Sequence, residues 1–244
     1  MHVNFDKQII EKLNDNWGRS KGGIKSPNNI KKIIKPKRNK YLSEVIGIIL
    51  GDGHVSEFKK DKKVRCYSIR IAGNAKTDRD YLINYIPLLF KKVFNEKGKV
   101  HFSKRSKVGY FTIYGKNFVE FIKTQGIKSG NKKKNKQGLP KWVRENKKYL
   151  LKCIRGLIDT DGSIHYISNT NLNLRISYTS HIPNLLKDVR EALISLGFNP
   201  SKVIRERQIF LSRKEDINKY VKEIGFGNQK NLNRLKILGK RMLL

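Results

Sequence analysis

The sequence predicts an α+β protein made of two similar halves, each with an antiparallel sheet and helices on one face of it. Two observations predict this fold class. An apolar segment that contains a glycine and ends in Asp-Gly occurs twice, at 45–53 and at 154–162. After each copy, strand-like and helix-like patterns follow in the same order, which indicates an internal duplication. We therefore expect each half to run as helix, hairpin, helix, hairpin, helix.

In the first half, the strands are predicted by residues that alternate between apolar and polar, and the helices by apolar residues at helical spacing. Pro87 should kink the second helix or delay its start, because proline lacks the backbone N–H. The expected elements are a helix at 45–53, strands at 54–58 and 67–71, a helix at about 78–94, strands at 99–104 and 108–114, and a short helix ending at 121–127.

The second half shows the same patterns, and Leu185, Val189, Leu193 and Leu196 mark its central helix by their spacing. We expect a four-stranded antiparallel sheet in each half. The elements expected here are a helix at 154–162, strands at 163–167 and 172–176, a helix around 185–196, strands at 202–207 and 208–213, and a short helix ending at 220–226.

The repeat also predicts how the chain is divided. We expect a basic N-terminal extension at 1–40, a first half at 41–130, a basic linker at 131–146 and a second half at 147–244. The extension is either a disordered arm or an arm that follows a phosphate backbone, and its composition does not decide between them.

Charge points to a polyanionic partner. The chain has 54 Lys and Arg against 20 Asp and Glu, a formal net charge of +34. Such a surplus cannot be paired internally and must face solvent or a polyanion. A membrane partner is not expected, since the sequence has neither a long apolar run nor the apolar stretch of a signal peptide. Cys66 and Cys153 have no paired spacing and are expected to be buried or half-buried thiols rather than zinc ligands or a disulfide. We therefore expect a reducing, intracellular setting, prokaryotic cytoplasm or an organelle.

The polar faces of the strands are the expected nucleic-acid contacts. Arg, Asn, Gln and Ser side chains hydrogen-bond base edges, although plain solvation is the alternative for any polar strand face. Phe210 fits this face poorly, which leaves the register of its strand open. The predicted DNA-binding residues are Ser56, Ser68, Arg70, Tyr110, Thr112, His165, Asn173, Arg175, Arg205, Arg207 and Gln208.

The repeated segment itself predicts a metal site. Gly47 and Gly156 occupy the same place in it, where the absence of a side chain lets two helices approach closely. If the helices cross there, Asp52 and Asp161 meet at the same end. Two carboxylates held together repel each other unless divalent cations lie between them, and Mg²⁺ prefers such oxygen ligands. A single Asp-Gly after a helix would more simply be a turn; two matching copies favour the metal site.

Both segments resemble the LAGLIDADG motif, and the chain from about Tyr41 onward resembles the single-chain LAGLIDADG homing endonucleases of the archaeal and intein-like type. The resemblance implies two pseudo-symmetric αββαββα halves whose sheets form a DNA-binding saddle. It places Asp52 and Asp161 on the acidic, metal-binding position, and it implies that Gly51 and Thr160 contribute backbone carbonyls to the metal site.

A basic residue near each metal is also implied by the resemblance. Lys132 and Lys230 match best, because each follows a Gly-Asn pair. Lysines close in sequence could take the first role instead, and Lys76 is a weaker candidate because its counterpart is His181. The alternatives to Lys132 are Lys133, Lys134 and Lys136.

The implied activity is that of a monomeric, site-specific endonuclease that cuts both strands of double-stranded DNA at a long asymmetric target. Mg²⁺ is the expected cofactor; Mn²⁺ should substitute, and Ca²⁺ should support binding without cleavage. The expected biological role is intron homing by an intron-encoded or free-standing enzyme, since no splicing-type flanks are visible. An RNA-binding intron maturase and a non-catalytic DNA-binding regulator on the same fold remain alternatives, so intron RNA is a second possible partner.

Overall fold

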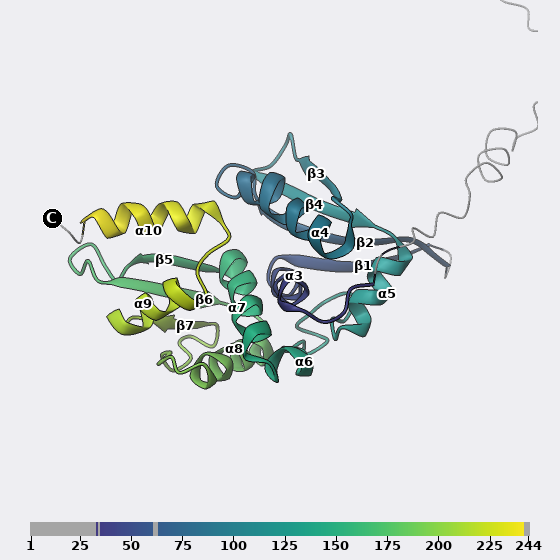
Figure 1. Ribbon diagram of the computed structural model, residues 1–244. Helices are drawn as coiled ribbons and strands as arrows, with labels where there is room; N and C mark the ends of the chain where they lie inside the picture. The colour runs from purple at the N-terminus through teal and green to yellow at the C-terminus, as the bar shows by residue number, and fades with distance from the viewer. Residues whose placement is uncertain (1–32, 34, 61–62, 242–244) are drawn as a thin grey trace, which may run out of the picture. The chain divides into compact units, whose positions relative to one another are not determined.

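The computed structural model describes residues 33, 35–60 and 63–241, which all belong to one compact unit spanning Lys32–Leu244. The predicted extension at 1–40 lies almost entirely outside these residues. Within the described part, two antiparallel sheets are each packed against helices, which confirms the α+β class (Figure 1). No helix in this part combines the length and apolar character that a membrane span requires.

The first half follows the predicted order closely. Its sheet has the strand order β1-β2-β4-β3, so the second hairpin packs beside the first through β2 and β4. The elements are α3 (Lys40–Leu50), β1 (Gly53–Lys60), β2 (Lys63–Asn74), the π-helix η1 (Tyr81–Tyr85), α4 (Ile86–Phe94), β3 (Lys99–Phe102), β4 (Val108–Tyr114) and α5 (Lys116–Thr124).

The helix between the two hairpins does not start late, because it runs from residue 79 through Pro87 to Phe94, but its turn before Pro87 is irregular. Pro87 lies in the first turn of α4, and the preceding turn is π-helical, with the Ile86 N–H donating to the Tyr81 carbonyl five residues earlier. Proline has no N–H to continue the regular pattern, so widening the preceding turn is a way to keep the chain helical across it.

The second half has the same order but a smaller sheet. Among the described residues this sheet has three strands, in the order β5-β6-β7. Its elements, with the linker helix before them, are α6 (Lys141–Arg144), α7 (Lys147–Asp161), β5 (Gly162–Tyr166), β6 (Leu174–Thr179), α8 (Pro183–Ser195), β7 (Gln208–Leu211), α9 (Lys214–Glu223) and α10 (Gln229–Arg241).

The fourth strand expected at 202–207 was a wrong prediction. Only an isolated bridge joins Ile204 to Gln208. Arg205 and Glu206 both adopt left-handed backbone conformations, with φ of 48° and 55°. Two consecutive left-handed residues make a tight turn directly after Ile204, and the chain therefore reverses before a strand can extend.

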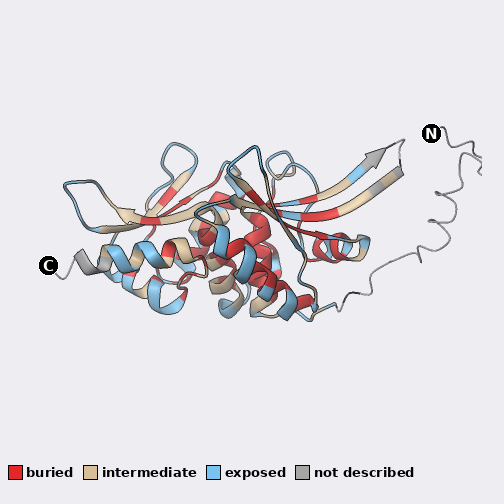
Figure 2. Ribbon diagram, turned by 90° about the horizontal axis from the view of Figure 1, so that it is seen from above, coloured by how far each residue is buried: buried red, intermediate tan, exposed pale blue. Residues whose placement is uncertain are grey.

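The two motif helices, α3 and α7, pack against each other at the centre of the described part (Figure 1). A Cβ atom added to Gly47 would lie 2.1 Å from the carbonyl oxygen of Cys153, and one added to Gly156 would lie 2.6 Å from that of Glu44. The predicted close crossing at the two glycines is thus present. Buried residues concentrate on these helices and on the inward faces of the sheets (Figure 2).

A buried ion pair also joins the two helices. Glu44 on α3 is 2% exposed, and its carboxylate lies 3.3 Å from the guanidinium of Arg155 on α7. The hydroxyl of Tyr85 donates to Glu44 and accepts a 2.6 Å hydrogen bond from Arg155, so both charges have polar partners. One charge comes from each half.

Gly47→Ala should destabilise the protein, because the new methyl group has no space unless α3 and α7 move apart. We expect a loss of about 1–3 kcal/mol in the free energy of unfolding, measured by chemical denaturation. Lys91→Ala, an exposed change on α4, is the control and should be close to neutral. An unchanged midpoint for Gly47→Ala would contradict the close crossing.

Candidate active site

The crossing brings the two motif aspartates to one place. Asp52 follows the end of α3, and Asp161 is the last residue of α7. A Cβ atom at Gly51 would lie 2.0 Å from the Thr160 hydroxyl oxygen and 3.2 Å from Oδ2 of Asp161. The ends of the two helices are therefore in contact, and the negative charge of Asp52 helps to raise the pKa of Asp161.

Both carboxyl groups hold their protons more tightly than an ordinary aspartate. Burial is the main cause and raises the pKa of Asp52 to about 6 and that of Asp161 to about 7. Repulsion adds to it, from Asp78 on Asp52 and from Asp52 on Asp161, while the positive charge of Lys132 opposes both shifts. Burial without compensation disfavours the charged form, and a nearby cation would restore it.

The donor set at this junction fits a divalent cation. Among the described residues, no protein group donates a hydrogen bond to either carboxylate. No group of three or more His, Cys, Asp or Glu side chains in this part of the chain could form a closed metal cage. Two carboxylates with open positions suit Mg²⁺, which retains waters and binds substrate phosphates. Asp52 and Asp161 would hold such an ion.

Lys132 is the lysine that contacts the motif. Its ammonium donates to the carbonyls of Leu50, at 2.8 Å, and of Gly51, at 2.5 Å. The Gly130 N–H donates to the Val55 carbonyl, which fixes the loop before Lys132 against β1. Burial lowers the pKa of Lys132 to about 8, against the opposing effect of Asp161 and Asp52. A weakly held proton thus lies beside the carboxylate pair.

Lys230 lies nearby in a different arrangement. Its ammonium forms a 2.7 Å ion pair with Asp78, and its positive charge also acts on Asp52. Lys76 lines the same surface hollow as Lys230, and Lys133 lines another with His181. Of the lysines considered from the sequence, only Lys132 and Lys230 are linked to the motif aspartates within the described contacts.

The carbonyl role expected of Gly51 and Thr160 remains a prediction. The Gly51 carbonyl already accepts from Lys132, but a carbonyl oxygen has a second lone pair. The Thr160 side chain turns back into its own helix and donates to the carbonyls of Gly156 and Leu157, both at 3.0 Å. That proton is thereby used within the helix, whereas the lone pairs of the hydroxyl and the Thr160 carbonyl are not used by these bonds.

The predicted DNA-contacting residues of the first half share one face of their sheet. The strand register pairs Ser56 with Ser68 and Arg70 with Thr112, on the face opposite the buried Ile69. Tyr110 lies beside them, with the Arg70 guanidinium 5.2 Å from its ring centre. Arg70 is exposed, whereas Ser68 and Thr112 are 7% exposed. Direct contact is therefore better supported for Arg70 and Tyr110.

In the second half, the outward face carries His165 and Arg175 as a register pair, and Gln208 on β7. Phe210 does belong to this face, which settles its register: the Arg175 guanidinium lies 4.4 Å from its ring centre. The ring therefore acts as a platform for the arginine, an arrangement the sequence pattern did not indicate.

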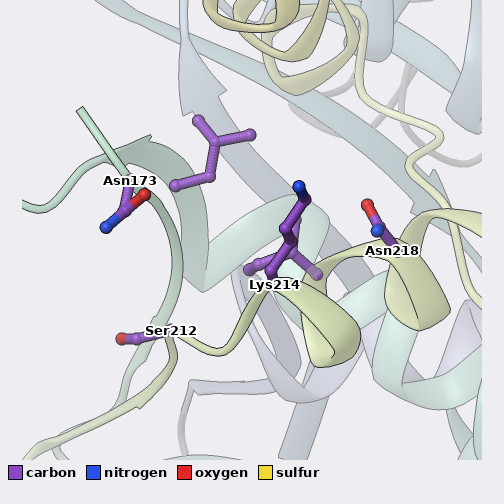
Figure 3. Close-up of a pocket in the computed structure, with 6 residues that line it drawn as sticks. Asn173, Ser212, Lys214 and Asn218 are labelled. Carbon is purple, nitrogen blue, oxygen red and sulfur yellow. The ribbon is translucent and has the colours of Figure 1, made fainter. Parts of the chain in front are cut away.

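Asn173, Arg205 and Arg207 lie outside the strands. Arg205 and Arg207 line the hollow that also contains Lys133 and His181. Asn173, just before β6, lines a hollow of about 180 Å³ with Ser212 and the α9 residues Lys214 and Asn218 (Figure 3). This hollow contains no acidic side chain, so it offers none of the carboxylate chemistry of the junction.

Three polar residues that the structure links to one another were not among the site residues predicted from the sequence. Asp159, with no counterpart in the first copy, is fully buried and accepts a 2.7 Å hydrogen bond from the Gly227 N–H. Asn228 donates both to the Asp159 carbonyl and to Asp78. The repeated Gly-Asn pair was a signal for Asn228, but no pattern marked Asp78.

Comparisons with known proteins bear on the fold of the chain. Residues 148–225 match the family model described as a LAGLIDADG-like domain. A replication factor C small subunit from Methanocaldococcus jannaschii is 28% identical over 150 residues, which is 60% of this chain and 8% of that protein. The chain thus spans only a small part of that relative.

Two solved structures show the same fold. The homing endonuclease I-DmoI, in a complex with DNA and Mn, aligns with a TM-score of 0.54 and 18% identity over 76% of this chain and 96% of its own. The meganuclease I-SmaMI, bound to uncleavable DNA, aligns with a TM-score of 0.53 and 13% identity over 86% and 91%. Residues 148–225 therefore match a LAGLIDADG-like domain, and the chain shares the fold of the single-chain LAGLIDADG homing endonucleases.

Proposed function

We propose that this protein is a divalent-metal-dependent endonuclease that cuts both strands of double-stranded DNA at a specific site. The observation that carries the proposal is the junction of α3 and α7, where Asp52 and Asp161 lie together beside Lys132. Each half supplies one carboxylate, as a reaction on two DNA strands requires. I-DmoI complexes with DNA and Mn and with DNA and Ca support the choice of substrate and of a divalent metal.

Within the site, the two carboxylates would hold the cations and, through them, the reacting phosphates. A bound divalent cation supplies an activated water and stabilises charge on the attacking and leaving oxygens. Lys132 donates to the motif carbonyls and is placed to orient water or to offset negative charge developing on a phosphate. Its lowered pKa also lets it exchange a proton near neutral pH.

The outward sheet faces would contact the DNA, one half-site each. Arg70 with Tyr110 in one sheet and Arg175 with Phe210 in the other offer guanidinium groups that aromatic rings hold in place. Because the two sheets differ in strand number and in these side chains, the target should be asymmetric and the enzyme should act as a monomer. Phosphate contacts by the many lysines would supply most of the affinity, with a steep dependence on salt.

We further propose Mg²⁺ as the natural cofactor and intron homing as the role.

Asp52→Asn and Asp161→Asn should each abolish double-strand cleavage while leaving DNA affinity within a few-fold. The amide keeps the shape of the side chain but is a poor cation ligand. The experiment incubates the protein with Mg²⁺ and a plasmid library of candidate target sequences, and the cut ends are sequenced. DNA binding without breaks by the wild-type chain would overturn the proposal in favour of a regulator, and preferential binding of intron RNA would favour a maturase.

Cation binding should strengthen as the pH rises through 6 to 7. The raised pKa values mean that between the ordinary value of 3.8 and the raised values of about 6 and about 7 the folded state holds protons on Asp52 and Asp161 that an unfolded chain has already released, so the metal-free protein loses stability as the pH rises through this window. A cation must displace these protons at low pH. We expect the affinity for Ca²⁺, measured by calorimetry, to be at least roughly tenfold higher at about pH 8 than at about pH 5.5. A pH-independent affinity would contradict these sites as ligands.

Arg70→Ala and Arg175→Ala should each relax sequence preference in one half-site only. The expected cost is about 1–3 kcal/mol of discrimination at the affected base pairs if the contact is bidentate. Sequencing the cut products of a library randomised in both half-sites measures this effect. Lys91→Ala, away from both sheets, is the control. Equal relaxation in both half-sites would show that the halves do not read the DNA separately.

A further inference from the structure

The two halves hold their equivalent lysines in different ways. Lys132 donates to the carbonyls of Leu50 and Gly51. Among the described residues, no carboxylate lies within ion-pair distance of Lys132. Lys230 instead forms its 2.7 Å ion pair with Asp78, and the two side chains are only 18% and 13% exposed. Each half therefore supplies an equivalent aspartate, but the two equivalent lysines have different partners: backbone carbonyls for Lys132 and a carboxylate for Lys230.

Asp78 is itself firmly held. Its Oδ2 accepts from the Asn74 N–H at 2.9 Å, and its Oδ1 accepts from the side-chain amide of Asn228, also at 2.9 Å. The oxygen of that amide accepts a 3.0 Å hydrogen bond from the Lys230 N–H. Burial alone would raise the pKa of Asp78, but hydrogen bonds from Lys230, Asn228 and Asn74 lower it overall. The carboxylate is thus a fixed negative anchor that joins the segment after β2 to the start of α10.

The second half has no such anchor. With Ile71 aligned to Ile176 and Lys76 to His181, the position of Asp78 falls on Pro183. Proline can neither pair with an ammonium nor accept through its side chain. The anchor is therefore a property of one half, and any effect of removing it should be confined to that half.

Without Asp78, the ammonium of Lys230 would face another carboxylate. Its positive charge already acts on Asp52, and so does the negative charge of Asp78. A released lysine on a flexible stem would move toward Asp52 and compete there with a cation. Asp78 keeps Lys230 close to the reacting centre while preventing it from neutralising the motif aspartate.

We propose that Asp78 is a positioning residue that holds the ammonium of Lys230 and thereby supports cleavage of one DNA strand and not the other. The proposal rests on the endonuclease function proposed above. It assigns no direct contact with DNA or metal to Asp78, which acts only through the lysine.

The first test needs neither DNA nor metal. The folded full-length chain is treated with an amine-acylating reagent, and modification of each lysine is followed by mass spectrometry. Lys230 should be acylated several-fold faster in Asp78→Asn than in the wild type, while Lys132 stays unchanged. Asp80→Asn is the matched control, because Asp80 is a neighbouring acid that contacts Asn84 instead. Equal Lys230 reactivity in Asp78→Asn and wild type would overturn the anchor.

The second test follows the two strands of a cleaved target separately, with a different label on each. Asp78→Asn should slow one strand by roughly 10- to 100-fold, the usual cost of a misplaced group, and leave the other within about threefold. Lys230→Met should slow cleavage of the same strand, and the double variant should cleave it no more slowly than Lys230→Met does. Asp78→Glu should recover part of the cleavage rate.

Equal slowing of both strands in a folded variant would overturn the strand-specific role. A wild-type chain that cuts no DNA would overturn the endonuclease proposal and this role with it, whereas the acylation result would still decide whether Asp78 holds Lys230.

Discussion

Contact between the backbones of α3 and α7 at Gly47 and Gly156 is the constraint on which the site depends. The two aspartates meet only because the helices that carry them cross with no side chain between them. An added methyl group at either glycine would meet a carbonyl oxygen of the partner helix, so the distance between the helices is fixed by backbone atoms. Backbone atoms cannot change rotamer, and the carboxylate pair is held correspondingly firmly.

Around this crossing, electrostatics and packing act in opposite directions. The carboxyl groups at the helix ends are only partly exposed, and this partial burial makes two adjacent carboxylates unfavourable when ionised. The protein tolerates this arrangement because the charges are few and each is near a cation, Lys132 or Lys230. Preorganised charge of this kind costs stability in the metal-free protein. In the proposed site, the same charge would favour a ligand that brings positive charge.

Much of the fold and part of the site could be predicted from the sequence, and the exceptions have physical causes. The duplication, the hairpins of the first half and the meeting of Asp52 with Asp161 followed from local patterns. The missing fourth strand did not, because the left-handed turn at Arg205 and Glu206 uses residues that usually avoid it. Asp78 contacts Asn228 and Lys230, which lie about 150 residues later in the chain, and no periodic pattern in a sequence predicts contacts of this kind. The burial of Ser68 and Thr112 likewise depends on neighbours in the folded sheet.

The buried pair of Glu44 and Arg155 has a consequence for how the halves can be combined. In the aligned motifs, Glu44 corresponds to Cys153 and Ile46 to Arg155. Two copies of the first half, crossing in the same way, would bury two glutamates without Arg155, and two copies of the second would bury two arginines without Glu44, each left with Asp159 of its own helix 3.9 Å away. Removing one partner of a buried ion pair typically costs about 3–5 kcal/mol. The Glu44–Arg155 pair therefore makes the two halves complementary: each half supplies the charge that the other needs, and a homodimer of either half would lack this match.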